Sequence, residues 1–115
     1  MINQSLYRQL DSYHNLEENW DSYGGMPINP KSIENVKKIF NELTKYDLIY
    51  YSIDIGALAS GGIDIYISHS NIYRMLVVDE NDIIDGFIIY NYRKENESKP
   101  QHYEFVMNDL FSLIN

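Results

Sequence analysis

The sequence predicts a single α+β domain spanning residues 1–115, in which a four-stranded antiparallel β-meander packs with two N-terminal helices and one C-terminal helix. Three observations lead to this prediction. Apolar residues make up 44% of the 115 residues, which is enough for one hydrophobic core. Their spacing follows the period of a helix before Tyr46 and that of a strand after it. Only short polar links separate the strand-like segments, as in an antiparallel meander.

The first helix is predicted over residues 5–16, where Leu6, Leu10 and Tyr13 recur at the spacing of one helical face. The next segment, residues 17–29, has no period and contains several turn-forming residues, so it is predicted to be a loop.

A second helix is predicted from Pro30 to about residue 45. The preceding Asn29 can accept a hydrogen bond from an unpaired N–H at the helix start, and Pro30 has no N–H to lose there. The apolar residues that follow recur on one helical face: Ile33, Val36, Ile39, Phe40 and Leu43.

Four strands are predicted over residues 49–55, 63–68, 72–78 and 83–92. In the first two, isoleucines alternate with other residues, which is typical of strands with one buried face. The last two are rich in β-branched and aromatic residues, and a polar turn separates them. The closing helix is predicted from an apolar stripe at helical spacing: Tyr103, Val106, Met107, Leu110, Phe111 and Ile114.

The charge balance narrows the class of partner. Seventeen Asp and Glu residues stand against nine Lys and Arg, which gives a formal net charge of −8. Direct binding to nucleic acid is disfavoured, because such binding rests on cations that neutralise phosphates. A basic or nucleic-acid-binding protein complex of the bacterial host is the expected partner. No segment has the roughly 20 apolar residues of a membrane span, and no secretory signal is recognised, so a cytoplasmic location in a bacterial or infected host cell is expected.

Catalytic and metal-binding patterns are not found in the sequence. The chain has no Cys, and no short motif joins its three histidines, His14, His69 and His102. It also lacks the glycine-rich phosphate-binding loops and the nucleophile elbow of common enzyme folds. We therefore predict no catalytic residue, no metal and no cofactor, and expect a protein that is not an enzyme.

Acidic residues supply the candidate partner-binding site. Asp79, Glu80, Asp82 and Asp85 form the strongest local negative field and would project toward a positively charged groove, although a plain solvated turn explains them as well.

Three residues of the first two predicted strands extend this candidate surface: Asp54, Asp64 and Tyr66. The two carboxylates would face each other if Ile55 paired with Ile63, which would suggest a cation site, a basic partner or two carboxylates that share a proton. The favoured expectation is a register in which they miss each other.

The segment from Glu18 to Pro27 carries a resemblance. Asn19, Trp20, Asp21, Tyr23, Gly24 and Pro27 match the motif Asn-Trp-Asp-Gly-Tyr-Gly-Ala followed by Pro, with Ser22 and Gly25 in place of the usual Gly and Ala. In this motif the chain resembles a family of small, uncharacterised bacterial and prophage-encoded proteins. The resemblance implies an α+β fold and a mobile-element setting.

The motif residues also have a physical interpretation. Trp20 and Tyr23 are expected to pin the loop to the core as aromatic plugs, and Asp21 to accept hydrogen bonds from N–H groups near Gly24. The alternative is a ligand pocket built from Trp20, Asp21 and Tyr23.

Three functions follow from these observations. The leading hypothesis is a non-enzymatic interaction module, a phage- or prophage-encoded inhibitor of a host defence complex of the CRISPR type, whose acidic surface imitates nucleic acid. The second is a small-molecule or nucleotide-binding module, or a cryptic hydrolase, that uses the loop from Trp20 to Gly25. The third is an antitoxin or immunity protein. A homodimer formed through tyrosine-rich strand edges is a further alternative.

Overall fold

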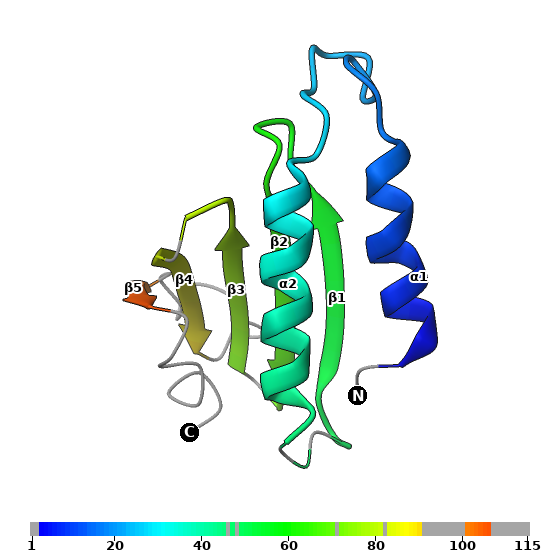
Figure 1. Cartoon of the computed structure of the whole chain (residues 1–115). Coiled ribbons are helices and arrows are strands. Elements are labelled where there is room, and N and C mark those ends of the chain that lie inside the picture. Colours follow the sequence, from blue (N-terminus) through cyan, green and yellow to red (C-terminus); the bar gives the residue numbers. More distant parts are fainter. Residues whose placement is uncertain are drawn as a thin grey trace.

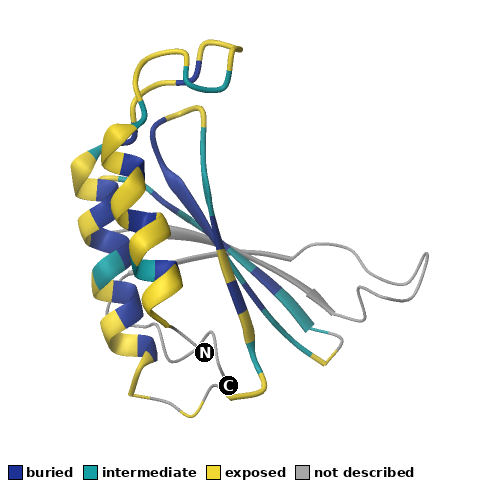
Figure 2. Ribbon diagram, turned by 90° about the vertical axis from the view of Figure 1, so that its right-hand side faces the viewer, coloured by how far each residue is buried: buried dark blue, intermediate teal, exposed yellow. Residues whose placement is uncertain are grey.

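The computed structural model describes residues 3–45, 47, 49–70, 72–81, 83–90 and 101–106, the last two ranges in their backbone alone. Its elements follow in the order α1 (Gln4–Ser12), the short 3-10 helix η1 (Tyr13–Asn15), α2 (Pro30–Leu43), β1 (Ser52–Ala57), β2 (Ile63–His69), β3 (Ile72–Val78), β4 (Ile83–Tyr90) and β5 (Gln101–Val106). The strands pair antiparallel in sequence order, β1-β2-β3-β4-β5 (Figure 1). Figure 2 shows both α-helices on the same face of the twisted sheet.

The predicted α+β class, with two N-terminal helices and an antiparallel sheet, is confirmed. The predicted closing helix does not begin where it was expected. Tyr103 lies in β5, opposite Gly86 of β4, so the sheet has a fifth strand at this place. Tyr103 fits the helical stripe of the residues after it, and it also alternates with polar residues as in a strand; pairing with the edge of β4 gives the segment its backbone hydrogen-bond partners. The rest of the predicted helix, residues 107–114, lies outside the described residues.

Both helices begin at an asparagine cap. Asn3 Oδ1 accepts a hydrogen bond of 3.2 Å from the backbone N–H of Leu6 at the start of α1. Asn29 Oδ1 accepts one of 2.8 Å from the N–H of Lys31 at the start of α2, where Pro30 takes the first helical position. These bonds satisfy N–H groups that have no partner within a helix, so the local sequence fixes where each helix starts.

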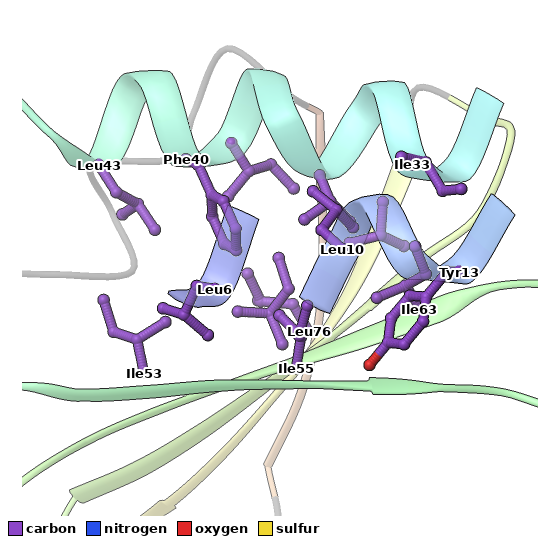
Figure 3. Close-up of a cluster of buried hydrophobic side chains, with 14 of the residues drawn as sticks. Leu6, Leu10, Tyr13, Ile33, Phe40, Leu43, Ile53, Ile55, Ile63 and Leu76 are labelled. Atoms are coloured by element: carbon purple, nitrogen blue, oxygen red, sulfur yellow. The ribbon is translucent and has the colours of Figure 1, made fainter. Parts of the chain in front are cut away.

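The hydrophobic core lies between the two helices and the sheet. In Figure 3, Leu10 of α1 and Phe40 of α2 point toward Ile55, Ile63 and Leu76 of the strands, and all five are buried. The alternation of buried and exposed residues along β1 sends isoleucine side chains to the helices, as expected for a sheet with one covered face.

The helix α1 also protects an edge of the sheet. It lies beside β1, the first strand of the sheet order, and Gln9 Nε2 donates to the backbone oxygen of Ile55 at 3.3 Å and to the Tyr13 hydroxyl at 3.1 Å. A side-chain donor thus occupies a carbonyl that an edge strand would otherwise offer to another chain.

The register between β1 and β2 separates the two aspartates of this hairpin. Ile55 pairs with Ile65, so Asp54 lies opposite Tyr66 and Asp64 lies opposite Gly56. The carboxylates share a face of the sheet but do not meet directly, which is the favoured expectation from the sequence. The register places Gly56 beside the buried Asp64, and a Cβ atom on Gly56 would lie 2.5 Å from Asp64 Oδ1.

Candidate functional site

One end of the molecule gathers three segments that are far apart in the sequence: residues 17–28, 58–62 and 79–81 (Figure 1). The N–H of Met26 donates to the Ala59 oxygen at 2.8 Å, which joins the first segment to the second. Asn29 Nδ2 donates to Glu80 Oε2 at 3.0 Å, which brings the third segment to the start of α2. We call these three segments the acidic end, because they contain no Lys, Arg or His and carry these carboxylates: Glu17, Glu18, Asp21, Asp79 and Glu80.

Hydrogen bonds within the loop 17–28 fix its shape. Asp21 Oδ1 accepts from the N–H groups of Tyr23, at 2.9 Å, and Gly25, at 2.7 Å. Asn19 Oδ1 accepts from the N–H of Gly24 at 2.7 Å. The expected role of Asp21, as an acceptor for N–H groups near Gly24, agrees with these bonds. The loop is therefore held by its own side chains rather than by contact with the sheet alone.

The two aromatic residues of the loop have different roles. Trp20 is half-buried against the core, and its indole N–H donates to the backbone oxygen of Met26 at 2.7 Å. Tyr23 is 92% exposed, so its expected role as a second plug is wrong. The reason lies in the backbone on either side, because Ser22 and Gly24 both have positive φ, 65° and 80°, and turn the chain outward at Tyr23.

The contacts of Asp21 predict an acid-sensitive loop. Hydrogen bonds from the N–H groups of Tyr23 and Gly25 hold the pKa of the Asp21 carboxyl below its ordinary value of 3.8. A carboxyl with a lowered folded-state pKa contributes stability that is present above the unfolded value and lost as the pH falls through the folded one. We expect the loop to loosen below about pH 4, which the emission of Trp20, the single tryptophan, will report.

The control for this titration is the variant Asp21→Asn, whose amide oxygen can accept the same bonds but carries no titrating charge. Its Trp20 emission should stay constant over the acid range in which the wild-type signal changes, once the global unfolding followed by far-UV circular dichroism has been subtracted. Superimposable acid titrations of the two proteins would contradict the role of Asp21.

The acidic turn after β3 is fastened to α2. The buried Asn35 donates through Nδ2 to the backbone oxygens of Asp79, at 2.9 Å, and Asn81, at 3.3 Å. Within the turn, Asp79 Oδ1 accepts from the N–H of Asn81 at 2.7 Å. Asp79 is half-buried by these contacts and Glu80 is exposed, so Glu80 is the better placed of the two to meet a partner.

The other two acidic candidates of this region are less fully described. Asp82 lies outside the described residues, and Asp85 is described only in its backbone, where it pairs with Val77 and Glu104.

A small polar pocket of about 200 Å³ lies where the acidic turn meets the start of α2. Its lining residues come from three elements: Asn29, Ser32, Ser60, Gly61, Gly62, Asp79 and Glu80. The volume is below the range of about 300–1,000 Å³ that is typical of sites for drug-sized ligands. The loop from Trp20 to Gly25 contributes none of the lining residues, so this pocket is not the aromatic-walled site of the alternative hypothesis.

The helix start beside the pocket has no N–H group to offer an anion. The backbone N–H of Lys31 donates to Asn29 Oδ1, and the N–H groups of Ser32 and Ile33 donate to the Asn29 backbone oxygen at 2.9 and 3.3 Å. With two carboxylates in the lining, the pocket suits hydrogen-bond donors and cations, and it disfavours phosphate.

The sheet residues of the candidate surface fall into two groups. Asp54 is exposed, whereas Asp64 is only 6% exposed and accepts a hydrogen bond from the Tyr66 hydroxyl through Oδ2. That bond and partial burial raise the pKa of the Tyr66 phenol well above its ordinary value. Asp64 is therefore a buried structural carboxylate in this fold, and it is not accessible to a partner as the sequence-based prediction required.

Glu17 and Glu18 belong to the acidic end but were not predicted to do so. The sequence contains the pair openly, yet only the folding of the loop onto the turns 58–62 and 79–81 brings them to the same end as Glu80. In the described part of the chain, no three His, Cys, Asp or Glu residues are grouped so as to hold a metal ion. None of the helices described here is long and apolar enough to cross a membrane.

Comparison with protein-family models, with curated proteins and with solved structures finds no match to this chain, so the site is interpreted from its own geometry.

Proposed function

We propose that the chain is a non-catalytic protein-interaction module whose acidic end binds the basic surface of a nucleic-acid-binding protein. The observation that carries the proposal is the combination, in one internally bonded loop, of the almost fully exposed Tyr23 with three carboxylates that precede it in the sequence, those of Glu17, Glu18 and Asp21. Such a loop offers an aromatic anchor inside a negative field, which suits a basic groove.

Charge supports the choice of partner. The whole chain has a formal net charge of −8, and the acidic end has no cation within its three segments to offset its carboxylates. A cluster of one sign raises the association rate with a surface of the opposite sign. Proteins that bind nucleic acid present basic surfaces for phosphates, and carboxylates can occupy the same surfaces.

Pre-organisation supports the choice of contact residues. Tyr23 and Met26 are large side chains that are 92% and 57% exposed, in a loop whose backbone is already fixed by hydrogen bonds. Ordering a flexible loop opposes binding, and here much of that entropy is lost before the partner arrives. Tyrosine is enriched among the residues that dominate interface energetics. We therefore place Tyr23 at the centre of the interface.

The small pocket supports recognition of a basic side chain. Its lining includes the acidic residues Asp79 and Glu80 and the hydroxyl-bearing Ser60. Lysine and arginine carry only donors on their charged groups, so either can satisfy these acceptors. The proposed contact is one Lys or Arg of the partner inserted beside Glu80 while Tyr23 packs on the surrounding surface.

The resemblance of the loop supplies the biological setting of the proposal. Its motif has Gly where this chain has Ser22, and Ser22 has a φ of 65°, a conformation that glycine adopts most readily. The family is bacterial and prophage-encoded, so the proposed role is the inhibition of a host defence complex of the CRISPR type. An antitoxin or immunity protein would bind a basic toxin by the same attraction between carboxylates and cations.

Replacing Tyr23 with alanine is expected to weaken partner binding about tenfold or more, as loss of an interface anchor does. The tagged full chain would be used to capture its partner from nuclease-treated bacterial lysate that contains defence complexes. The partner, once identified and purified, would be titrated with wild type and variant, and binding should weaken as salt is raised.

The matched control is Tyr50→Ala, because Tyr50 is 80% exposed and lies between α2 and β1, away from the acidic end. Its affinity should equal that of the wild type. The charge-reversal variant Glu80→Lys should bind more weakly than the wild type, and its loss of affinity should be larger at low salt than at high salt. Equal losses for Tyr23→Ala and Tyr50→Ala, or full binding by both Tyr23→Ala and Glu80→Lys, would rule out the acidic end as the contact surface.

A further inference from the structure

Arg74 lies on the side of the sheet that faces the helices. It is opposite Ile67 of β2 and, by the alternation of a strand, shares its face with Leu76 and Val78. All three of these neighbours are core residues, and Arg74 itself is only 6% exposed. A permanently charged side chain therefore occupies a position where the rest of the strand presents aliphatic groups.

The guanidinium of Arg74 has no counter-ion among the residues that the structure describes. Its Nε and Nη1 atoms are buried without a hydrogen-bond partner. Among the residues the structure describes, the ion pairs join lysines to Glu34, Asp11 and Glu42, and none includes Arg74. Burial removes the hydration of a cation, and at Nε and Nη1 no hydrogen-bond acceptor replaces it, so the arrangement is unfavourable unless an anion completes it.

The end of α2 does not supply the missing charge. Figure 3 shows Leu43, the last residue of α2, beside Ile53, and Ile53 is opposite Ile67, the neighbour of Arg74. A helix C-terminus carries a partial negative charge of only about half a unit. The Nε and Nη1 donors of Arg74 have no hydrogen-bond acceptor. The partial charge at the end of α2 therefore leaves both donors unsatisfied.

A second donor lies on the same face as Arg74. His69 is opposite Ile72, which places it diagonally across from Arg74 in the antiparallel pair. Diagonal neighbours of this kind are within reach of long side chains. The imidazole of His69 is stacked on the ring of Tyr51, with centroids 4.6 Å apart and planes at 22°, which fixes its orientation.

We propose that Arg74, with His69 as a second donor, forms a binding site for an oxyanion, a carboxylate or a phosphate group. The planar guanidinium offers parallel N–H groups that match two oxygens of such a group. Because so little of Arg74 is exposed, a ligand presents only its terminal oxyanion there while its remainder stays outside. The site lies near the start of β3, whereas the acidic end follows the end of β3, so the two are independent.

The test is thermal unfolding of the full chain in increasing inorganic phosphate, with sodium chloride of equal ionic strength as the reference. Phosphate also stabilises proteins by exclusion from their surfaces, so the comparison is made between variants. Arg74→Met replaces the guanidinium by an apolar group, and Arg8→Met makes the same change at an exposed arginine of α1. We expect phosphate to raise Tm saturably by about 4 °C or more in wild type and in Arg8→Met, and not in Arg74→Met.

The source of the oxyanion is settled by the same measurements. If phosphate has no specific effect but Arg74→Met alone lowers Tm by several degrees, a carboxylate of the chain itself holds the guanidinium. An Arg74→Met protein that is as stable as wild type and responds to phosphate identically would overturn the proposal. Should Arg74→Met not fold, Arg74→Lys replaces it, because lysine keeps the charge but loses the fork. We then expect a roughly tenfold higher half-saturating phosphate concentration, and an unchanged value would equally overturn the site.

Discussion

Replacing Phe40 with alanine should lower the free energy of unfolding by about 3–5 kcal/mol, the usual loss for a fully buried phenylalanine. Phe40 is completely buried on α2, and its ring meets the ring of Tyr7 of α1 edge-on, with centroids 5.4 Å apart. It therefore joins the two helices to each other as well as to the sheet (Figure 3). Urea unfolding followed by circular dichroism will give the free energy, with the m-value as a check on two-state behaviour.

The control for Phe40 is Tyr50→Ala, which removes an aromatic ring of similar size from a position that is 80% exposed. Its effect should stay within about 0.5 kcal/mol, because such surface substitutions leave the core intact. A Phe40→Ala protein that loses less than about 1 kcal/mol would show that the two helices do not pack on the sheet as described.

Local signals explain why α2 could be predicted from the sequence. Asn29 and Pro30 act within one turn of the helix they start, and their hydrogen bonds need no distant partner. The strand β3 was predicted equally well, because its content of β-branched and aromatic residues is a property of the segment itself. Side chains of a strand alternate between its two faces, so the place of Arg74 on the face of Leu76 and Val78 follows once the segment is recognised as a strand.

The fifth strand could not be predicted, because its structure depends on a distant partner. Around Tyr103 the apolar residues satisfy the helical period together with residues further along the chain, and they satisfy the strand period among themselves. Pairing of Tyr103 with Gly86 decides for the strand, and this contact spans 17 positions of the sequence. Pairing with the edge of β4 therefore decides the structure of this segment, and its own sequence pattern does not.

The acidic end could not be predicted from the sequence either, because it is formed by segments that are far apart in the chain. Asn29 and Glu80 are 51 positions apart, and their hydrogen bond joins the turn to the start of α2, where the loop ends. Nothing in either segment alone indicates the other. The exposure of Tyr23 was also hidden, because it follows from positive φ angles at Ser22 and Gly24, and only the glycine suggests such a backbone.

The buried Asp64 leads to the second large effect, which is expected for the variant Gly56→Ala. A methyl group on Gly56 would lie 2.5 Å from Asp64 Oδ1, so the carboxylate would have to leave its place. That movement would break the hydrogen bond from the Tyr66 hydroxyl to Asp64 Oδ2. Overpacking and the lost bond to a charged group together should lower the free energy of unfolding by about 2–4 kcal/mol, measured by urea unfolding.

A double-mutant cycle separates this clash from a general intolerance of the strand to alanine. If the methyl group acts by displacing the carboxylate, then Asp64→Ala removes the obstacle. The protein with both Gly56→Ala and Asp64→Ala should be more stable than the sum of the single changes by about 1–3 kcal/mol. Gly24→Ala is the control glycine, because a methyl group there meets nothing within 4 Å. The only strain expected in Gly24→Ala comes from the φ of 80° at this position, which costs about 1–2 kcal/mol for a residue other than glycine. Strict additivity of Gly56→Ala and Asp64→Ala would mean that the carboxylate does not fill the space beside Gly56, and the β1–β2 register would then have to be different.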